Sequence, residues 1–334
     1  MGTVIDPPLP AGTVIGTYPT NSYPLEQSID AFGNIWIGSW LDGTVIKMSP
    51  AGAILATYPV TPAPDCTAVD ASGNVWLCNQ AAASLTKISP TGKVLGTFAT
   101  APGGGPDSIA IDQRGNVWCS NSNLTSVTVL NSSGKLIGTY STGSGAPWNV
   151  VIDPGGNAWT GNFSSATMSK LSPTGELLGV FPVGSEPQVF AIDAYGNVWV
   201  PGQGDGTLTK LNSEGVRLFT VATPIAGPGG LALDGGGNVW IYGGNRIAEL
   251  NPEGKVLLTL TSGVGQLAYA SVDRAGYLWV TNYGDSTITR IATGSKGVIT
   301  PTVKNFPRFP RFWCGLHSPP GLCEDASGQV DFRP

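Results

Sequence analysis

Several features that mark other protein classes are scarce in this chain. Histidine occurs once, at His317, charged residues make up only 12% of the 334 residues, and 17 Lys and Arg residues are spread along its length. No apolar run approaches the ~18 residues of a membrane-spanning helix. With a net charge of -5 and no basic stripe, the chain is predicted to have no nucleic-acid partner and no membrane insertion.

The first residues also lack a targeting signal. Residues 1–6 read MGTVID and contain neither the basic region nor the apolar segment of a secretory signal peptide. Two explanations stay open: a signal was removed, or the protein never used one.

What the chain has in abundance is one repeated pattern, D-x-x-G-N-x-W. Six copies and a seventh, in which Tyr277 replaces Asn, begin at Asp30, Asp70, Asp112, Asp153, Asp193, Asp234 and Asp273. Successive copies start 39 to 42 residues apart. A constant period in this range indicates an array of structural repeats.

Each repeat has the pattern of four short strands. In the second repeat, the apolar or alternating segments 67–69, 74–77, 85–88 and 93–98 are separated by Gly, Pro and Asn. No amphipathic helical period appears. The sequence therefore predicts an all-β protein: a seven-bladed β-propeller of four-stranded blades over residues 1–293, followed by a non-repeat C-terminal extension at 294–334.

The recurring Asp, Gly and Trp are interpreted as scaffold rather than as a site. The Asp carboxylate caps a tight turn, Gly supplies a positive φ, and Trp packs between neighbouring blades. Seven copies of a hinge are reasonable, whereas seven copies of a catalytic carboxylate are not.

The ring needs a closing strand, and the N-terminal segment matches one. Gly12 precedes Asp30 by the same 18 residues that separate Gly52 from Asp70. We therefore expect residues 11–18 to form the outer strand of the last blade and remove an open sheet edge. Segment 297–303 is the alternative.

The motifs G-N-V-W, T-x-T-K-I/L and S-P-x-G make residues 11–293 resemble NHL-type propellers, most of all the seven-bladed streptogramin (virginiamycin B) lyase group. The gluconolactonase family, whose members hold a divalent metal in the channel, is a more distant resemblance. The resemblance implies the fold but no activity. Streptogramin lyases use histidines and a glutamate with Mg²⁺, and the matching positions here carry no histidine. No catalytic residue is therefore carried over.

Two positions vary beside the repeated ones. Six repeats place Pro six residues before the Asp, and the two positions after that proline differ between repeats. The first holds Leu25, Asp65, Asp107, Trp148, Gln188, Gly229 and Ala268; the second holds Glu26, Cys66, Ser108, Asn149, Val189, Gly230 and Tyr269. Variation on a constant scaffold is expected at a binding surface, and solvated rim residues are the alternative.

A ligand site is predicted from these positions and from the loop after the Trp. Its amides and aromatic rings are Asn79, Asn121, Asn162, Asn282, Trp40, Trp148, Phe163, Tyr242, Tyr269 and Tyr283, a set that suits a glycan. The alternative for the asparagines is local turn capping. Glu26, Asp65 and Asp107 come from consecutive blades and could share a divalent cation, Ca²⁺ or Mg²⁺, in the central channel.

The five cysteines suggest two pairs and one free thiol. Cys66 and Cys78 lie symmetrically about the turn of the second repeat, so they are expected to be cross-strand neighbours, either as a disulfide or as two buried thiols. Cys314 and Cys323 bracket a short turn-rich segment and are expected to be bonded in an oxidising setting. Cys119 has no evident partner.

The C-terminal extension contains a compact aromatic and cationic stretch, Phe306, Arg308, Phe309, Arg311, Phe312 and Trp313. It could dock on the propeller itself or attach the protein to a larger assembly.

The function favoured by the sequence is a non-enzymatic binding or assembly propeller with a protein or surface-glycan partner. We expect it to be extracellular or exposed on an envelope, virion or filament. The alternatives are a metal-dependent lyase or hydrolase at the channel mouth and a lectin-like glycan-binding propeller.

Overall fold

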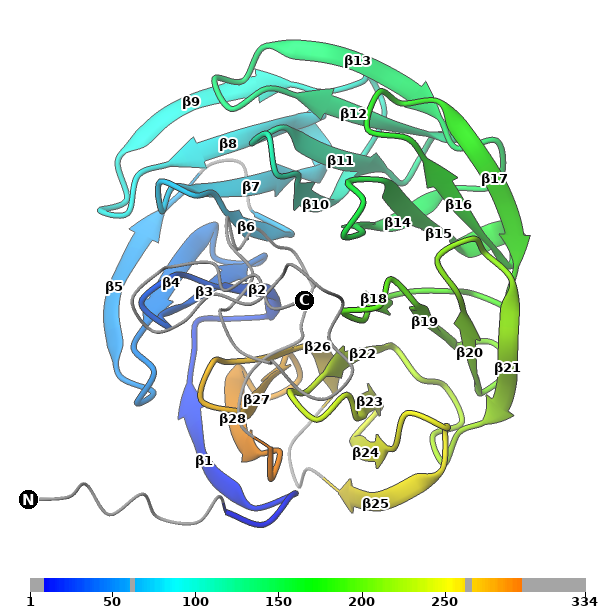
Figure 1. Ribbon diagram of the computed structural model, residues 1–334. Coiled ribbons are helices and arrows are strands. Elements are labelled where there is room, and N and C mark those ends of the chain that lie inside the picture. The colour runs from blue at the N-terminus through cyan, green and yellow to red at the C-terminus, as the bar shows by residue number, and fades with distance from the viewer. Residues whose placement is uncertain (1–8, 61–63, 262–265, 296–334) are drawn as a thin grey trace, which may run out of the picture.

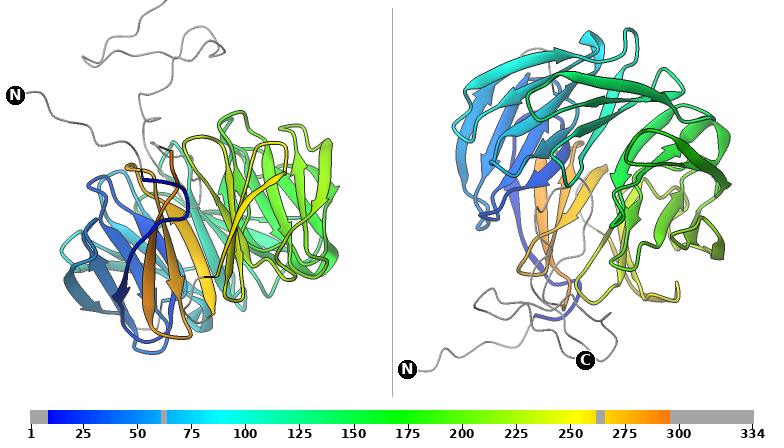
Figure 2. Two further views of the ribbon diagram at one scale, coloured as in Figure 1. Left: turned by 90° about the horizontal axis from the view of Figure 1, so that it is seen from below. Right: turned by 45° about the horizontal axis from the view of Figure 1, so that its top comes forward.

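The computed structural model describes residues 9–60, 64–261 and 266–295. They form seven four-stranded antiparallel sheets that stand as blades around a ring (Figure 1). The views of Figure 2 show the blades following one another around the central axis. The predicted all-β, seven-bladed fold is thus confirmed.

The four strands of each blade follow one another from the ring centre outward. The inner strands are β2 (Pro24–Ile29), β6 (Thr67–Val69), β10 (Pro106–Ile111), β14 (Pro147–Ile152), β18 (Ala191–Ile192), β22 (Gly230–Leu233) and β26 (Leu267–Val272). The second strands are β3 (Ile35–Ser39), β7 (Val75–Asn79), β11 (Val117–Asn121), β15 (Ala158–Asn162), β19 (Val198–Gly202), β23 (Val239–Gly243) and β27 (Tyr277–Asn282).

The third strands are β4 (Thr44–Met48), β8 (Ser84–Ile88), β12 (Ser126–Leu130), β16 (Thr167–Leu171), β20 (Thr207–Leu211), β24 (Arg246–Leu250) and β28 (Thr287–Ala292). The outer strands are β5 (Ile54–Pro59), β9 (Val94–Ala99), β13 (Leu136–Ser141), β17 (Leu177–Pro182), β21 (Arg217–Ala222), β25 (Val256–Thr261) and β1 (Val14–Pro19). Two 3₁₀ turns, η1 (Gln80–Ala82) and η2 (Phe163–Ser165), follow β7 and β15. No helix among the described residues has the length and hydropathy to cross a membrane.

The repeated Asp holds the turn between the inner and second strands. In the first blade, Asp30 Oδ1 accepts hydrogen bonds from the backbone N–H groups of Phe32 and Asn34, both at 2.9 Å, and Oδ2 accepts one from Trp36 Nε1 at 3.1 Å. Gly33 has φ 82°, which a residue with a Cβ rarely adopts. One carboxylate therefore fixes both the turn and the Trp ring, as the scaffold interpretation predicts.

The second blade varies this arrangement. Asp70 Oδ2 forms an ion pair with Lys87 Nζ at 2.9 Å, and the same Nζ lies 4.8 Å from the centroid of the Trp76 ring. Trp76 Nε1 is buried with no hydrogen-bond partner among the described residues. The lysine thus takes the acceptor that the indole N–H uses in the first blade.

The seven Trp side chains fill the spaces between blades. All are at most 1% exposed. Trp36 of the first blade packs with Val69, Val75 and Leu77 of the second. Burying so large an apolar side chain at each interface is a substantial hydrophobic contribution to the stacking of one blade on the next.

The N-terminal strand closes the ring. β1 pairs antiparallel with β28, with Thr17 opposite Thr289, and completes the sheet β1-β28-β27-β26. Figure 1 shows β1 along the outer side of that blade. The predicted closure by residues 11–18 is therefore observed, whereas the alternative segment 297–303 lies outside the described residues.

Candidate functional site

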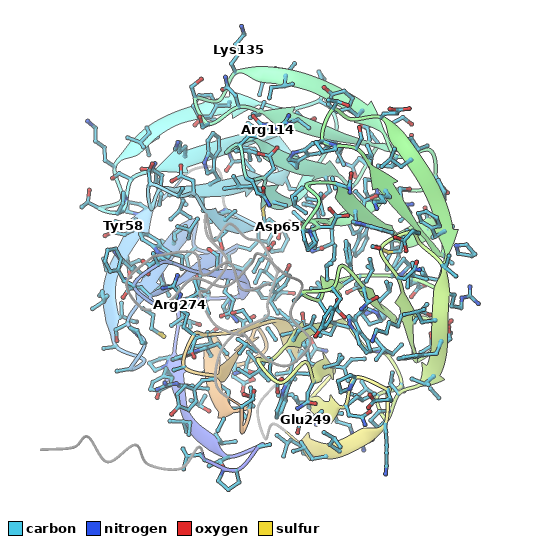
Figure 3. All side chains as sticks on the ribbon, viewed as in Figure 1. Tyr58, Asp65, Arg114, Lys135, Glu249 and Arg274 are labelled. Carbon is cyan, nitrogen blue, oxygen red and sulfur yellow. A yellow bond between two sulfur atoms is a disulfide. The ribbon has the colours of Figure 1, made fainter. Side chains whose placement is uncertain are left out.

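Residues at the start of the inner strands, or just before them, surround a cavity of about 140 Å³. Five residues predicted to bind a ligand line it: Glu26, Asp65, Asp107, Trp148 and Tyr269. Asp65 lies near the middle of the ring in Figure 3, whereas Tyr58 and Lys135 lie toward its outer edge. The lining comes entirely from the two positions that vary between repeats, with Ser108, Asn149 and Gln188 among the further members.

Irregular pairing explains how two consecutive positions reach the same cavity. Neighbouring side chains of a regular strand point to opposite faces, but the pairing shifts at the start of β2, β10, β14 and β26. Asp107 and Ser108 together lie opposite the single residue Ser120. Such a β-bulge re-aims side chains. The Ser108 backbone N–H donates to Ser120 Oγ at 3.0 Å, so this N–H keeps a hydrogen-bond partner where the strand pairing is interrupted.

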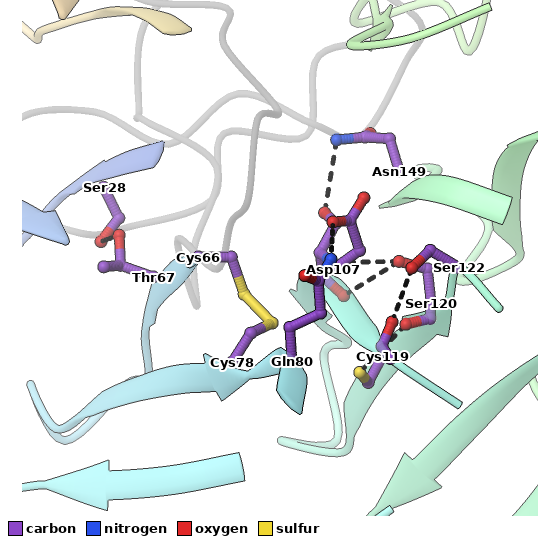
Figure 4. The surroundings of a disulfide bond; sticks show 12 residues. Ser28, Cys66, Thr67, Cys78, Gln80, Asp107, Cys119, Ser120, Ser122 and Asn149 are labelled. Atoms are coloured by element: carbon purple, nitrogen blue, oxygen red, sulfur yellow. Dashed lines mark hydrogen bonds between the residues drawn. A yellow bond between two sulfur atoms is a disulfide. The ribbon is translucent and has the colours of Figure 1, made fainter. Parts of the chain in front are cut away.

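Two carboxyl groups share one hydrogen bond at the wall of the cavity. The Asp65 and Asp107 side chains are hydrogen-bonded to each other. Gln80 Nε2 donates to Asp107 Oδ1 at 3.0 Å (Figure 4). Burial raises the pKa of Asp65 to about 6. Burial, together with the charges of Asp65 and Glu26, raises the pKa of Asp107 well above its ordinary value. Two carboxyl groups can bond in this way only when one carries a proton.

Asn149 is the centre of a second set of hydrogen bonds at the cavity. Asn149 Nδ2 donates to Ser108 Oγ at 3.3 Å and to Tyr269 Oη at 3.2 Å. Tyr269 is also hydrogen-bonded to Glu26, and burial raises the pKa of Tyr269 well above its ordinary value. The phenol therefore stays protonated and donates to the Glu26 carboxylate.

Aromatic side chains stand near the cavity and at a second place on the same face. Trp148 is 38% exposed and lies flat on Phe163, the first residue of η2, with ring centroids 4.1 Å apart and planes at 8°. Tyr23 contacts Trp40 and Tyr283, with centroid distances of 5.9 and 5.0 Å. Trp40 and Tyr283 do not line the cavity, and Tyr23 was not recognised from the sequence because it lies outside the compared positions.

The four asparagines that follow the Trp residues, which were predicted to bind a ligand, do not line the cavity. Each is at most 1% exposed, and each side-chain amide donates to two hydroxyl groups on the third strand of its own blade. Asn79, for example, donates to Ser84 Oγ and Thr86 Oγ1 at 3.0 and 2.9 Å. These asparagines are Asn79, Asn121, Asn162 and Asn282. Tyr242, only 1% exposed, is likewise inside the core.

The carboxylates predicted to share a cation do meet, but in a different arrangement. Glu26, Asp65 and Asp107 line one cavity. Within residues 9–60, 64–261 and 266–295, no three His, Cys, Asp or Glu side chains are grouped so that they could hold a metal ion. Asp65 and Asp107 are instead bonded to each other. The divalent cation stays a prediction.

A disulfide lies beside the carboxyl pair. Cys66 and Cys78 are bonded, with their Cα atoms 5.0 Å apart, and Figure 4 shows the bridge next to Gln80 and Asp107. It joins the residue after Asp65 to β7. Cys119 is a buried free thiol, and burial raises its pKa. The predicted pair Cys314 and Cys323, and the docking residues between 306 and 313, lie outside the described residues.

Solved structures share this architecture. A streptogramin B lyase matches with a TM-score of 0.76 and 17% identity over 85% of this chain and 99% of its own. A catalytically inactive histidine-to-alanine variant of virginiamycin B lyase from Staphylococcus aureus, with quinupristin, matches with a TM-score of 0.76 and 15% identity over 83% of this chain and 98% of its own. At such identities the likeness concerns the fold.

A comparison with curated proteins found no match. The model of the virginiamycin B lyase family, in contrast, matches residues 53–304, which is most of the chain. The chain therefore belongs to the virginiamycin B lyase family.

Proposed function

We propose that this chain is a non-enzymatic binding propeller that holds part of a ligand or partner in the central cavity. The observation that carries the proposal is the origin of the lining: the cavity is built from the two positions that differ between otherwise similar blades. A constant scaffold with a variable lining is the usual arrangement of a recognition site.

The comparison with the lyases supports a role other than lyase catalysis. The Staphylococcus aureus protein with a histidine replaced by alanine is described as catalytically inactive. The only histidine here, His317, lies outside the described residues and outside the repeats. A surface-exposed or extracellular location is supported by the Cys66–Cys78 disulfide, because such bonds persist in oxidising compartments.

Quinupristin provides the test of the non-enzymatic proposal. The full chain is incubated with quinupristin and Mg²⁺, and the antibiotic is followed by chromatography and mass spectrometry beside a streptogramin B lyase as the positive control. We expect quinupristin to elute unchanged. Conversion that depends on this protein would overturn the proposal, and a His317→Ala variant would show whether His317 takes part in it.

The carboxyl pair favours one second candidate, an acid–base hydrolase. Two carboxyl groups that share a proton in a buried site are suited to give and accept protons during hydrolysis. A panel of chromogenic ester, lactone and glycoside substrates distinguishes the candidates. Turnover that is lost in Asp107→Asn and retained in the exposed-carboxylate control Glu176→Gln would favour the hydrolase over the binding propeller.

The aromatic surface that Trp148 presents at the cavity favours a glycan as a further candidate ligand. A glycan array compares the full chain with Trp148→Ala and with Trp40→Ala, which alters an exposed Trp outside the cavity. Binding that is lost only in Trp148→Ala would identify a lectin-like propeller.

A further inference from the structure

We infer that the central cavity recognises an organic cation, an ammonium or guanidinium group at the end of a ligand. The inference rests on the proposed binding function and names the chemical class of the group that enters the cavity.

The cavity has more hydrogen-bond acceptors than donors. Glu26, Asp65 and Asp107 contribute three carboxyl groups, and no Lys or Arg among the described residues is part of the lining. Asn149 Oδ1 accepts no hydrogen bond within the described residues, although the side chain lines the cavity and the residue is only 3% exposed. A buried acceptor of this kind costs free energy unless a donor reaches it.

Several donors near these acceptors already have partners. Gln80 Nε2 donates to Asp107, and Asn149 Nδ2 donates to Ser108 and Tyr269. Gln188 Nε2 donates to Gln203 Oε1 at 2.6 Å. A ligand that complements the cavity must therefore bring several N–H donors and positive charge, which ammonium and guanidinium groups supply and a neutral hydroxyl compound does not.

Size and the aromatic wall agree with this class. The volume of about 140 Å³ is larger than the ~10–15 Å³ that one water needs, so a small head group fits while a whole peptide antibiotic does not. Trp148 lines the cavity, and Phe163 covers one face of its indole. An indole beside buried carboxylates stabilises a cation through its ring quadrupole.

Binding of a cation should be linked to proton release. Burial raises the pKa of Asp65 to about 6, and burial together with the neighbouring carboxylates raises the pKa of Asp107 well above its ordinary value. The hydrogen-bonded pair therefore carries a proton near neutral pH. A cation favours the ionised carboxylates and displaces that proton. The other titratable groups facing the pair are Glu26, Tyr269, Tyr242 and Cys119; burial keeps the two phenols and the thiol neutral. Affinity should therefore rise with pH.

Isothermal titration calorimetry of the full chain with n-butylammonium and methylguanidinium chloride tests the inference, at constant ionic strength and with n-butanol as the neutral control. We expect saturable binding of the cations only, about tenfold weaker at about pH 5 than at about pH 8. Asp107→Asn and Glu26→Gln should each weaken binding at least about tenfold, and Glu176→Gln, an exposed carboxylate on an outer turn, should leave it unchanged. Unfolding curves establish that each variant is folded.

The same charge is present in the chain's own Arg308 and Arg311, so one arm of the experiment distinguishes the source. A variant with Arg308→Gln and Arg311→Gln should bind the probes more tightly if these guanidinium groups compete for the cavity, and equally if the cation comes from another molecule. Both results support a cation site. Absence of probe binding in both chains, or binding unaffected by Asp107→Asn, would overturn it. Neither result would bear on quinupristin turnover, so failure of the inference is separable from failure of the proposed function.

Discussion

Glu249 in β24 shows how one residue can depart from the blade pattern. In the other blades the residue paired with the Trp is Lys47, Lys87, Val129, Lys170, Lys210 or Arg290, and each lysine or arginine lies over the Trp ring. Glu249 instead lies opposite Trp240, and Asn238 Nδ2 donates to its Oε1 at 2.8 Å. Burial, and then the charge of Asp234, raises the pKa of Glu249 to about 7.

Replacing Glu249 with Gln should stabilise the protein only at higher pH. Because the folded-state pKa lies above the ordinary value of 4.5, the folded state keeps a proton that the unfolded state loses, and stability falls as pH rises from about 4.5 to about 7. Gln keeps the hydrogen bond without the charge. Denaturant unfolding should show a gain on the order of 1–2 kcal/mol at about pH 8 and no gain at about pH 4. An equal change at both pH values would contradict the assignment, and Glu176→Gln serves as the matched control.

At the scale of single elements, the inner strands differ most between blades. β6 has three residues and β18 has two, whereas β2, β10, β14 and β26 have six and begin with shifted pairing. In the second blade, the Cys66–Cys78 disulfide holds the chain just before the short β6, beside Asp65. The disulfide thus helps to position the start of the inner strand in this blade, as longer strand pairing does in the blades of β2, β10, β14 and β26.

Replacing both cysteines with serine should loosen this element. The bond closes a loop with a sequence separation of 12, for which the chain-entropy model predicts a loss of about 2–3 kcal/mol. Thermal unfolding with and without a reductant measures it: reductant should lower the Tm of the native chain and leave that of the double variant unchanged. A reductant effect of the same size in both proteins would place its cause elsewhere, for example at other cysteines.

At the scale of the whole molecule, the stability of the ring depends on its closure by β1. Without β1, the edge of β28 is left unpaired, and an open edge invites pairing between molecules. If the last blade unfolds, both of its neighbours also lose a packed interface, so the ring is no longer closed.

Deletion of residues 1–19 should therefore lower the free energy of unfolding by several kcal/mol, and with it the Tm. The truncated protein should also form aggregates that gel filtration detects. Deletion of residues 1–8 is the control, since it leaves β1 (Val14–Pro19) in place, and it should change neither property. A monomeric protein of native Tm after the longer deletion would contradict closure by this strand.

Periodicity alone predicted the blade count, the closing strand and the two positions in each repeat that supply the cavity lining, because each follows from the spacing of turn residues within one chain. It could not place the asparagines, because the partners of the Asn79 amide are Ser84 and Thr86 on the third strand, and only the folded blade brings these hydroxyl groups to it.

The repeat pattern by itself determined the architecture, since local turn chemistry and strand alternation are properties of short segments. The tertiary structure decided the site: that bulges turn consecutive side chains into one cavity, that Asp65 and Asp107 share a proton, and that Asn149 Oδ1 is left as a buried acceptor. These properties depend on distances and burial between blades about 40 residues apart in sequence, for which the chain carries no local signal.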